Sequence, residues 1–187
     1  ALNLALPKDH RVAYVGGGAD NVGLWLARMG FDVTELDARA LSEELSDFPA
    51  IVVGIFAFGL RPDLAASAKA LHAYVEAGGN LVTLYHRPWD GWNPDAVPPR
   101  FLKIGQPSLR WRVTNPDAPV EILAAGNPVL AGPNPISVSD FKGWNKERGL
   151  YFASEWDGAY TPLLAMNDKG EAPLEGSLLT AEIGKGR

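Results

Sequence analysis

The sequence contains no cysteine, and this absence removes several kinds of chemistry at once. Without a thiol, the chain forms no disulfide, offers no thiolate to a metal ion and has no cysteine nucleophile. Its three histidines, His10, His72 and His86, are scattered, and no His-x-x-x-His spacing joins them. Metal sites need clustered ligands, so we expect no metal ion and no cofactor.

The chain also lacks a basic excess and a long hydrophobic run. Lys and Arg number 17 against 22 Asp and Glu, for a net charge of -5, and no basic block could follow a phosphate backbone. The longest apolar run, residues 50–60, is too short to span a membrane, and the start of the chain does not resemble a signal peptide. We therefore expect no nucleic-acid partner and no membrane partner; the composition does not fix the compartment, although it favours the cytoplasm.

Length and composition favour a single domain over residues 1–187. With 187 residues and 47% hydrophobic content, the chain can bury a full core. It begins on Ala rather than Met and stops directly after Gly184-Lys185-Gly186-Arg187, so we expect it to be a piece of a longer protein. The sequence does not indicate an oligomeric state.

The first half alternates strand and helix patterns, which is typical of a parallel sheet flanked by helices. Strands are predicted over residues 11–15, 31–36, 50–56 and 80–85, and helices over residues 22–29 and 62–77, with a weaker helical turn at 40–45. The run at 50–56 is apolar and β-branched, as in a strand buried on both faces, and we place it at the centre of the sheet. The pattern predicts an α/β fold.

The loop after the fourth predicted strand is the most informative stretch of the chain. It carries His86, Arg87, Trp89 and Asp90. Ligands of open α/β sheets gather beyond the carboxyl ends of the strands, so these side chains are candidates for the mouth of a site. The alternative is structural: Arg87 pairs with Asp90, the tryptophans cover a sheet edge, and nothing binds.

The second half changes character. Residues 88–135 are rich in proline, which indicates irregular surface structure interrupted by short strands. One such strand is predicted at 109–114, where Arg110 and Arg112 form a basic face that could bind an anion or meet acidic residues across the sheet. Further strands are predicted at 149–155, 162–166 and 177–183, and the last two resemble a hairpin with a long loop.

Two motifs of known chemistry are present only in part. The turn Gly16-Gly17-Gly18 with Asp37 after the second strand superficially matches a dinucleotide-binding unit. The third glycine of that motif is replaced by Asn21, so a plain glycine turn is the simpler interpretation. No serine lies in a Gly-x-Ser-x-Gly elbow, so the sequence offers no hydrolase triad of that kind.

A second group of polar and aromatic residues lies further along the chain, at Trp144, Lys146 and Arg148. Indole faces beside charged groups suit sugars, because the ring stacks on apolar C–H faces while the polar groups bind hydroxyls. Such residues also fill cores and form structural ion networks.

Three phrases of the sequence carry a resemblance to a known family. They are residues 84–90, Leu-Tyr-His-Arg-Pro-Trp-Asp; residues 104–113, Ile-Gly-Gln-Pro-Ser-Leu-Arg-Trp-Arg-Val; and residues 146–152, Lys-Glu-Arg-Gly-Leu-Tyr-Phe. Together with the Gly78-Gly79 strand and the terminal Gly-Lys-Gly-Arg, they resemble the class I glutamine amidotransferase-like domain, of trehalose-utilisation type, attached to large bacterial PIG-L-type deacetylases. The resemblance covers nearly the whole chain and implies a flavodoxin-like three-layer α/β/α fold, with a mostly parallel sheet and a β-rich C-terminal part.

The same resemblance implies an accessory role. Amidotransferases of this family place a cysteine at the elbow where this chain has Tyr85-His86, and the PIG-L zinc motif is also missing. We therefore expect a non-catalytic domain that binds carbohydrate or a partner for a linked sugar deacetylase domain. The expected ligand-binding residues are His86, Arg87, Trp89, Asp90, Arg110, Arg112, Trp144, Lys146 and Arg148.

Two other hypotheses stay open. The chain could be a hydrolase or isomerase that uses His86 as general base, oriented by Asp90 or Glu155. It could also serve assembly alone, through a large apolar patch.

Overall fold

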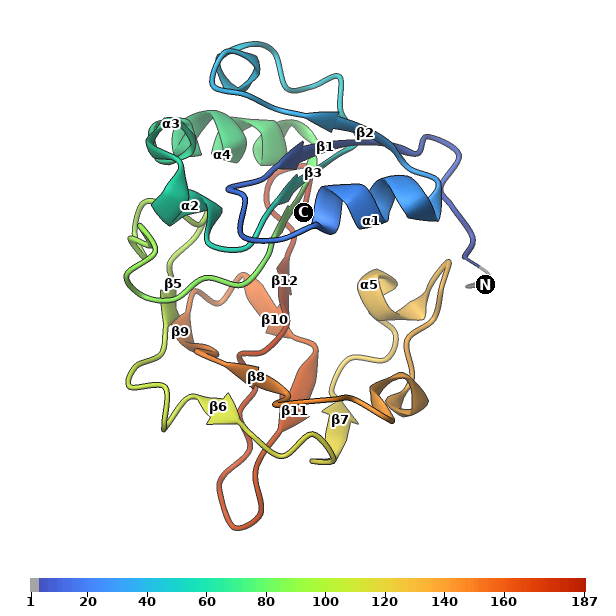
Figure 1. The fold of residues 1–187 in the computed structure, drawn as a ribbon, viewed down its shortest axis with the longest axis vertical. Coiled ribbons are helices and arrows are strands. Elements are labelled where there is room, and N and C mark those ends of the chain that lie inside the picture. Colours follow the sequence, from blue (N-terminus) through green and yellow to red (C-terminus); the bar gives the residue numbers. More distant parts are fainter. Residues whose placement is uncertain (1–3) are drawn as a thin grey trace. The chain divides into compact units, whose positions relative to one another are not determined.

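The computed structural model describes residues 4–187 and shows a mixed α/β fold (Figure 1). The chain divides into two compact units. Ala1–Pro99 and Glu182–Arg187 form one, here called the parallel-sheet unit, and Arg100–Ala181 form the other, the antiparallel unit. That residues 1–187 form a single domain stays a prediction, because two compact units can belong to one domain.

The parallel-sheet unit is built on four parallel strands in the order β2-β1-β3-β4. Their bounds are Arg11–Val15 (β1), Asp32–Glu35 (β2), Ala50–Val53 (β3) and Asn80–Thr83 (β4). The alternation of strand and helix in the sequence is confirmed, because each pair of consecutive strands is joined by a crossover and not by a tight hairpin. β3 is central, with Ile51, Val52 and Val53 all buried, as its β-branched run predicts.

Helices lie on both sides of this sheet (Figure 1). α1 (Val22–Met29) packs Val22 and Leu26 against the face that carries Val12, Tyr14 and Val52. It ends at Gly30, as predicted, because this residue has a φ of 103°. The connections that follow β2 and β3 contain η1 (Ala40–Ser42), α2 (Ala57–Leu60), α3 (Pro62–Ala66) and α4 (Ala68–Ala77).

Two predicted elements of this unit differ from the structure. The helix expected from Pro62 is interrupted at Ser67, whose hydroxyl donates to the carbonyl oxygen of Asp63 at 2.8 Å. The strand expected over residues 50–56 stops at Val53, because the chain turns through Gly54 into α2. This early turn shapes the surface described below.

The antiparallel unit consists of short strand pairs. Its strands are β5 (Leu102–Ile104), β6 (Arg112–Val113), β7 (Val120–Ile122), β8 (Gly149–Leu150), β9 (Ala153–Trp156), β10 (Tyr160–Pro162), β11 (Leu164–Met166) and β12 (Leu179–Ala181), with α5 (Pro128–Ala131) and η2 (Val138–Phe141) between them. The pairs are β5 with β9, β6 with β8, β7 with β11 and β10 with β12. The β-rich character predicted for this part of the chain is confirmed.

The predicted hairpin near the C-terminus is present. β10 pairs with β12 in antiparallel register, and Leu163 and Met166 continue that pairing with Leu178 and Leu174. The strand predicted at 109–114 is shorter than expected, since only Arg112–Val113 pair and Leu109 is 78% exposed. A two-residue strand cannot present the continuous basic face that the alternation suggested.

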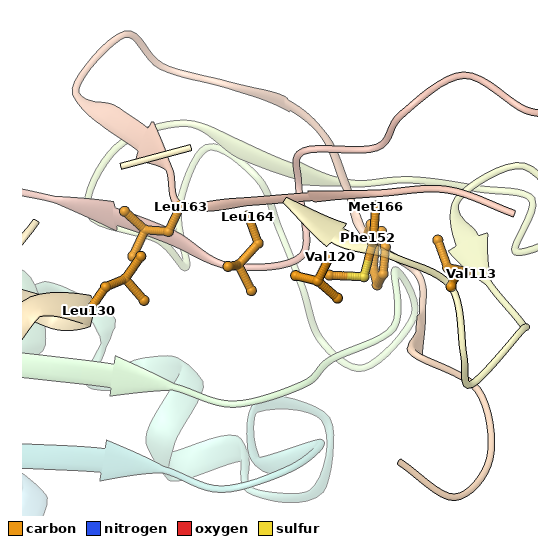
Figure 2. Packing of buried hydrophobic residues seen from close by; sticks show 8 residues of the cluster. Val113, Val120, Leu130, Phe152, Leu163, Leu164 and Met166 are labelled. Carbon is orange, nitrogen blue, oxygen red and sulfur yellow. The ribbon is translucent and has the colours of Figure 1, made fainter. Parts of the chain in front are cut away.

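Buried aliphatic side chains form the core of the antiparallel unit (Figure 2). Leu163, Leu164 and Met166 come from the β11 segment, and they meet residues from β6, β7, α5 and the segment after β8. The members labelled in Figure 2 are Val113, Val120, Leu130, Phe152, Leu163, Leu164 and Met166. Removal of this apolar surface from water joins short strands that could not be stable alone.

Among residues 4–187, no helix has the length and apolar character needed to cross a membrane.

Candidate binding surface at the carboxyl ends of the parallel strands

The four parallel strands end at one edge of their sheet, and three of the loops that follow carry the candidate side chains. These loops are residues 16–20 after β1, residues 54–56 after β3 and residues 84–92 after β4. The strand order reverses between β1 and β3, because β2 lies on one side of β1 whereas β3 and β4 follow on the other. Open α/β sheets usually bind ligands at such a position.

In this protein, the carboxylate of Asp20 occupies that position. Its Oδ1 accepts a hydrogen bond from the amide of Val22 at 2.8 Å, and its Oδ2 accepts one from the amide of Ile55 at 2.7 Å. The hydroxyl of Tyr14 also donates to Oδ1. A Cβ atom at Gly54 would lie 2.8 Å from Oδ2 of Asp20, so a larger residue there would displace the carboxylate. Asp20 thus joins the loops after β1 and β3.

The electrostatics of Asp20 agree with this role. Burial raises the pKa of Asp20, but the hydrogen bonds from Tyr14, Val22 and Ile55 outweigh burial and lower it below its usual value. The carboxylate is therefore ionised. It accepts from the Val22 amide at the start of α1, a donor that a bound phosphate group would need. The arrangement favours the plain glycine turn over the dinucleotide interpretation of Gly16-Gly17-Gly18.

Phe56 adopts a left-handed backbone conformation directly before α2, with φ 59° and ψ 9°. This conformation is uncommon for a bulky residue, and it resembles the strained turn between strand and helix that carries the nucleophile in some hydrolases. Here the residue is an aromatic one. Its amide donates to the carbonyl oxygen of Tyr85 at 3.1 Å, which fixes the turn to the end of the β4 segment.

His86 is buried, with 3% of its surface exposed, and both of its ring nitrogens bind the backbone. Nδ1 lies 2.7 Å from the carbonyl oxygen of Leu84, so it carries the proton, and Nε2 accepts from the amide of Phe58 at 3.2 Å. The ring packs between Phe58 and Trp92, with centroid distances of 5.4 and 5.5 Å. Burial lowers the pKa of His86, so the neutral form is favoured.

This geometry corrects the expectation that His86 lies at an open mouth. A general base needs a lone pair that can reach a substrate, but the lone pair of Nε2 already accepts from Phe58. Within the described part of the chain, neither ring nitrogen of His86 is hydrogen-bonded to a carboxylate, so Asp90 does not orient it directly. His86 instead ties the β4 loop to the start of α2.

Asp90 is also buried, with 6% of its surface exposed, and it binds Arg87. Oδ2 accepts from Nε of Arg87 at 2.9 Å and from the Arg87 amide at 2.7 Å, and Oδ1 accepts from Nη2 at 2.8 Å. Burial alone raises the pKa of Asp90, but the Arg87 hydrogen bonds outweigh it and lower the pKa. The ion pair proposed as the structural alternative is present, and Asp90 does not face solvent.

Trp89 is the aromatic residue of this loop whose ring faces solvent, with 59% of its surface exposed. The guanidinium of Arg87 lies 5.3 Å from the centre of the Trp89 ring and 4.2 Å from the centre of the Phe56 ring. Arg87 is thus stacked against two aromatic rings while Asp90 fixes its orientation. We call Phe56, Arg87, Trp89 and Asp90 the Trp89 platform.

The other five predicted site residues belong to the antiparallel unit, and two of them, Arg112 and Arg148, form side-chain hydrogen bonds within it. Arg112 donates to Glu171 at 2.6 and 3.0 Å and lies 3.5 Å from Asp168. Arg148 donates to the carbonyl oxygens of Ala118 and Phe141. The expectation that arginines meet acidic residues is confirmed for Arg112, and Arg148 holds a loop in place.

The remaining three residues lie at the surface of the antiparallel unit. Trp144 is 44% exposed and stacks on Phe141, with ring centres 5.6 Å apart. Lys146 is exposed and has a φ of 125°, and Arg110 is exposed with its guanidinium 5.8 Å from the Trp111 ring. That these residues support one site together with the Trp89 platform stays a prediction.

Sequence reasoning missed three residues of this edge: Tyr14, Asp20 and Phe56. Asp20 could be recognised only as a helix cap, Tyr14 lies within an apolar strand, and Phe56 lies within an apolar run. One usable signal was Gly54, because glycine directly after a buried strand often permits close approach of another group. Across residues 4–187, no group of three or more His, Asp or Glu side chains is arranged to hold a metal ion.

Comparisons of this chain with protein-family models, with curated proteins and with solved structures find no match.

Proposed function

We propose that this chain is a non-catalytic, amidotransferase-like accessory domain that binds carbohydrate through the Trp89 platform. The observation that carries the proposal is the exposed ring of Trp89, backed by a guanidinium that Asp90 holds in place. An exposed indole that packs against a fixed guanidinium can stack on the apolar face of a sugar without a large loss of side-chain entropy.

The chemistry of the neighbouring groups supports binding over catalysis. Three groups at this sheet edge that could move a proton are His86, Asp90 and Asp20, and each is already hydrogen-bonded within the protein. Their bonds hold three loops together, so their loss would disturb the platform as well as any proton transfer. The charge of Arg87 is matched by that of Asp90, which suits a neutral sugar better than an acidic one.

The context of the proposal comes from the family resemblance. Helices on both sides of a parallel sheet agree with a flavodoxin-like three-layer arrangement for this unit. On the same resemblance, we propose that the domain serves a linked PIG-L-type sugar N-deacetylase, whose substrates are N-acetylated sugars. Binding of the polymer near the deacetylase would raise the local concentration of its substrate.

The test is isothermal calorimetry with a β-1,4-linked N-acetylglucosamine oligomer as the probe. The wild-type chain should bind the oligomer, and Trp89→Ala should weaken binding about tenfold or more, because stacked aromatic residues dominate such surfaces. Trp25→Ala is a matched control, since Trp25 is 53% exposed and also lies beside an arginine, with Arg28 at 4.8 Å. Absence of binding, or an equal loss in both variants, would count against the proposal.

A further inference from the structure

The antiparallel unit carries a second exposed indole, that of Trp144, in the loop between η2 and β8. Trp144 is 44% exposed, and its ring stacks on that of Phe141, with ring centres 5.6 Å apart and planes 7° from parallel. Stacking occupies one face of the indole, so a ligand can stack on the other. The two rings therefore form a candidate site outside the parallel-sheet unit.

Phe141 gives this stack a firm support. The ring is partly buried and packs against the core of the antiparallel unit. Phe141 is also the last residue of η2, and the start of η2 is fixed by a capping box. There Oδ2 of Asp140 accepts from the amide of Ser137 at 2.7 Å and from its hydroxyl at 3.0 Å. Because Phe141 is held in place, little ordering of the Trp144 ring is needed when a ligand binds.

The guanidinium of Arg148 lies beside both rings, 5.4 Å from the centre of Trp144 and 6.0 Å from the centre of Phe141. Its Nε and Nη2 donate to the carbonyl oxygen of Ala118 at 3.1 and 2.8 Å, and Nη1 donates to that of Phe141 at 2.7 Å. Each terminal nitrogen carries a second hydrogen, which has no partner within residues 4–187. Arg148 is thus held in one orientation with donors left for a ligand.

The charge of Arg148 distinguishes it from the other half-buried arginines of the described chain. Each of the others forms an ion pair with a carboxylate: Arg61, Arg87, Arg112 and Arg187. Arg148, which is also half-buried, pairs with no carboxylate among residues 4–187. Buried cations are normally paired, because burial removes the water that stabilises the charge. The carbonyl groups orient Arg148 but leave its charge for an anionic ligand to match.

The loop around Trp144 adds to this positive charge. Residues 142–148 contain Lys142, Lys146 and Arg148 against the single acid Glu147, in a chain whose net charge is -5. Lys146 is exposed and adopts a φ of 125°, a conformation that residues with a side chain rarely take. Such conformations cluster at sites where a ligand is held. Charge and backbone conformation therefore point to the same loop as the stacked rings.

We propose that Phe141, Trp144 and Arg148, here called the Trp144 site, bind a uronic acid residue of an acidic sugar. The sugar ring stacks on the open face of Trp144, and its carboxylate accepts from the terminal nitrogens of Arg148. The preferred charge differs from that at the Trp89 platform, where Asp90 already neutralises Arg87. The proposal does not depend on the Trp89 platform, because all three residues belong to the antiparallel unit.

The test is calorimetry of the wild-type chain at pH 7 with a trimer of galacturonic acid and with the methyl ester of the same trimer. The ester keeps the rings that stack but lacks the carboxylates, so it should bind at least about tenfold more weakly than the acid. This comparison needs no change in the protein. Equal binding of acid and ester, or no binding of the acid, would overturn the proposal. Adenosine monophosphate is the third probe, and its binding without that of the trimer would also overturn it.

Two variants locate the binding of the trimer. Trp144→Ala should weaken it about tenfold or more, whereas Trp25→Ala, which removes an indole of similar exposure beside another arginine, should leave it unchanged. A similar loss in both variants would overturn the proposal. Loss of trimer binding in Trp89→Ala would also overturn it, since the acidic sugar would then lie on the Trp89 platform. Failure of the N-acetylglucosamine oligomer to bind the wild-type chain would contradict the proposed function and leave this result unaffected.

Discussion

The guanidinium of Arg87 binds both carboxylate oxygens of Asp90, and the same carboxylate also accepts from the Arg87 amide. The Asp90 side chain is 8% exposed and that of Arg87 is 35% exposed, so the pair lies at the boundary between core and solvent. Because Asp90 binds both the backbone and the side chain of Arg87, it fixes the position of the guanidinium that lies against the Trp89 ring.

Replacement of Asp90 by asparagine should lower the free energy of unfolding by about 2–3 kcal/mol, because Arg87 loses the charge that offsets its partial burial. The measurement is urea unfolding at pH 7. Asp95→Asn is the control, since Asp95 lies further along the connection between β4 and β5 and has an exposed side chain. Similar losses for the two variants would show that the Arg87 pair contributes little.

Acidification should destabilise the wild-type protein through His86. Its pKa in the folded state is lowered from 6.5 by burial, so the unfolded chain binds a proton at a higher pH than the folded chain does. Stability is therefore full above about pH 6.5 and falls as the pH drops from there towards the folded pKa. Unfolding curves between pH 7.5 and 5.5 should show this loss, together with an NMR titration of the ring.

His86→Gln removes that titration, so its stability should change less over the same range of pH. His10→Gln is the matched control, because His10 is exposed near the start of the chain. A His86 ring that titrates at or above its ordinary value would contradict the buried, neutral geometry.

Loss of the Asp20 carboxylate should destabilise the sheet edge more than loss of the Tyr14 hydroxyl. Asp20→Ala leaves the amides of Val22 and Ile55 without their acceptor, for an expected cost of about 2–3 kcal/mol, whereas Tyr14→Phe should cost about 1 kcal/mol. In Asp20→Ala, the Tyr14 hydroxyl has already lost its partner. The double variant should therefore cost less than the sum of the single variants, and strict additivity in urea unfolding would argue against the shared network.

The arrangement of elements was largely predictable from residue patterns, and the chemistry of the candidate site was not. β1 and α1 have the predicted bounds, and the hairpin of the antiparallel unit follows from its turn residues. The prediction for His86 and Asp90 was wrong in one respect: both side chains lie inside, although loop residues of this type usually face water. Their partners are backbone groups and one arginine. A backbone partner cannot be recognised from the sequence, because every residue type carries the same backbone carbonyl group.

Local residue patterns set where strands and helices alternate, because apolar periodicity and glycine or proline breaks act over a few neighbouring residues. Three features of the site follow from the three-dimensional packing alone: Asp20 joins the loops after β1 and β3, Phe56 adopts a left-handed conformation, and the Trp89 ring faces solvent. These outcomes depend on contacts between segments far apart in the chain, where burial and hydrogen-bond partners are set by packing and not by local pattern.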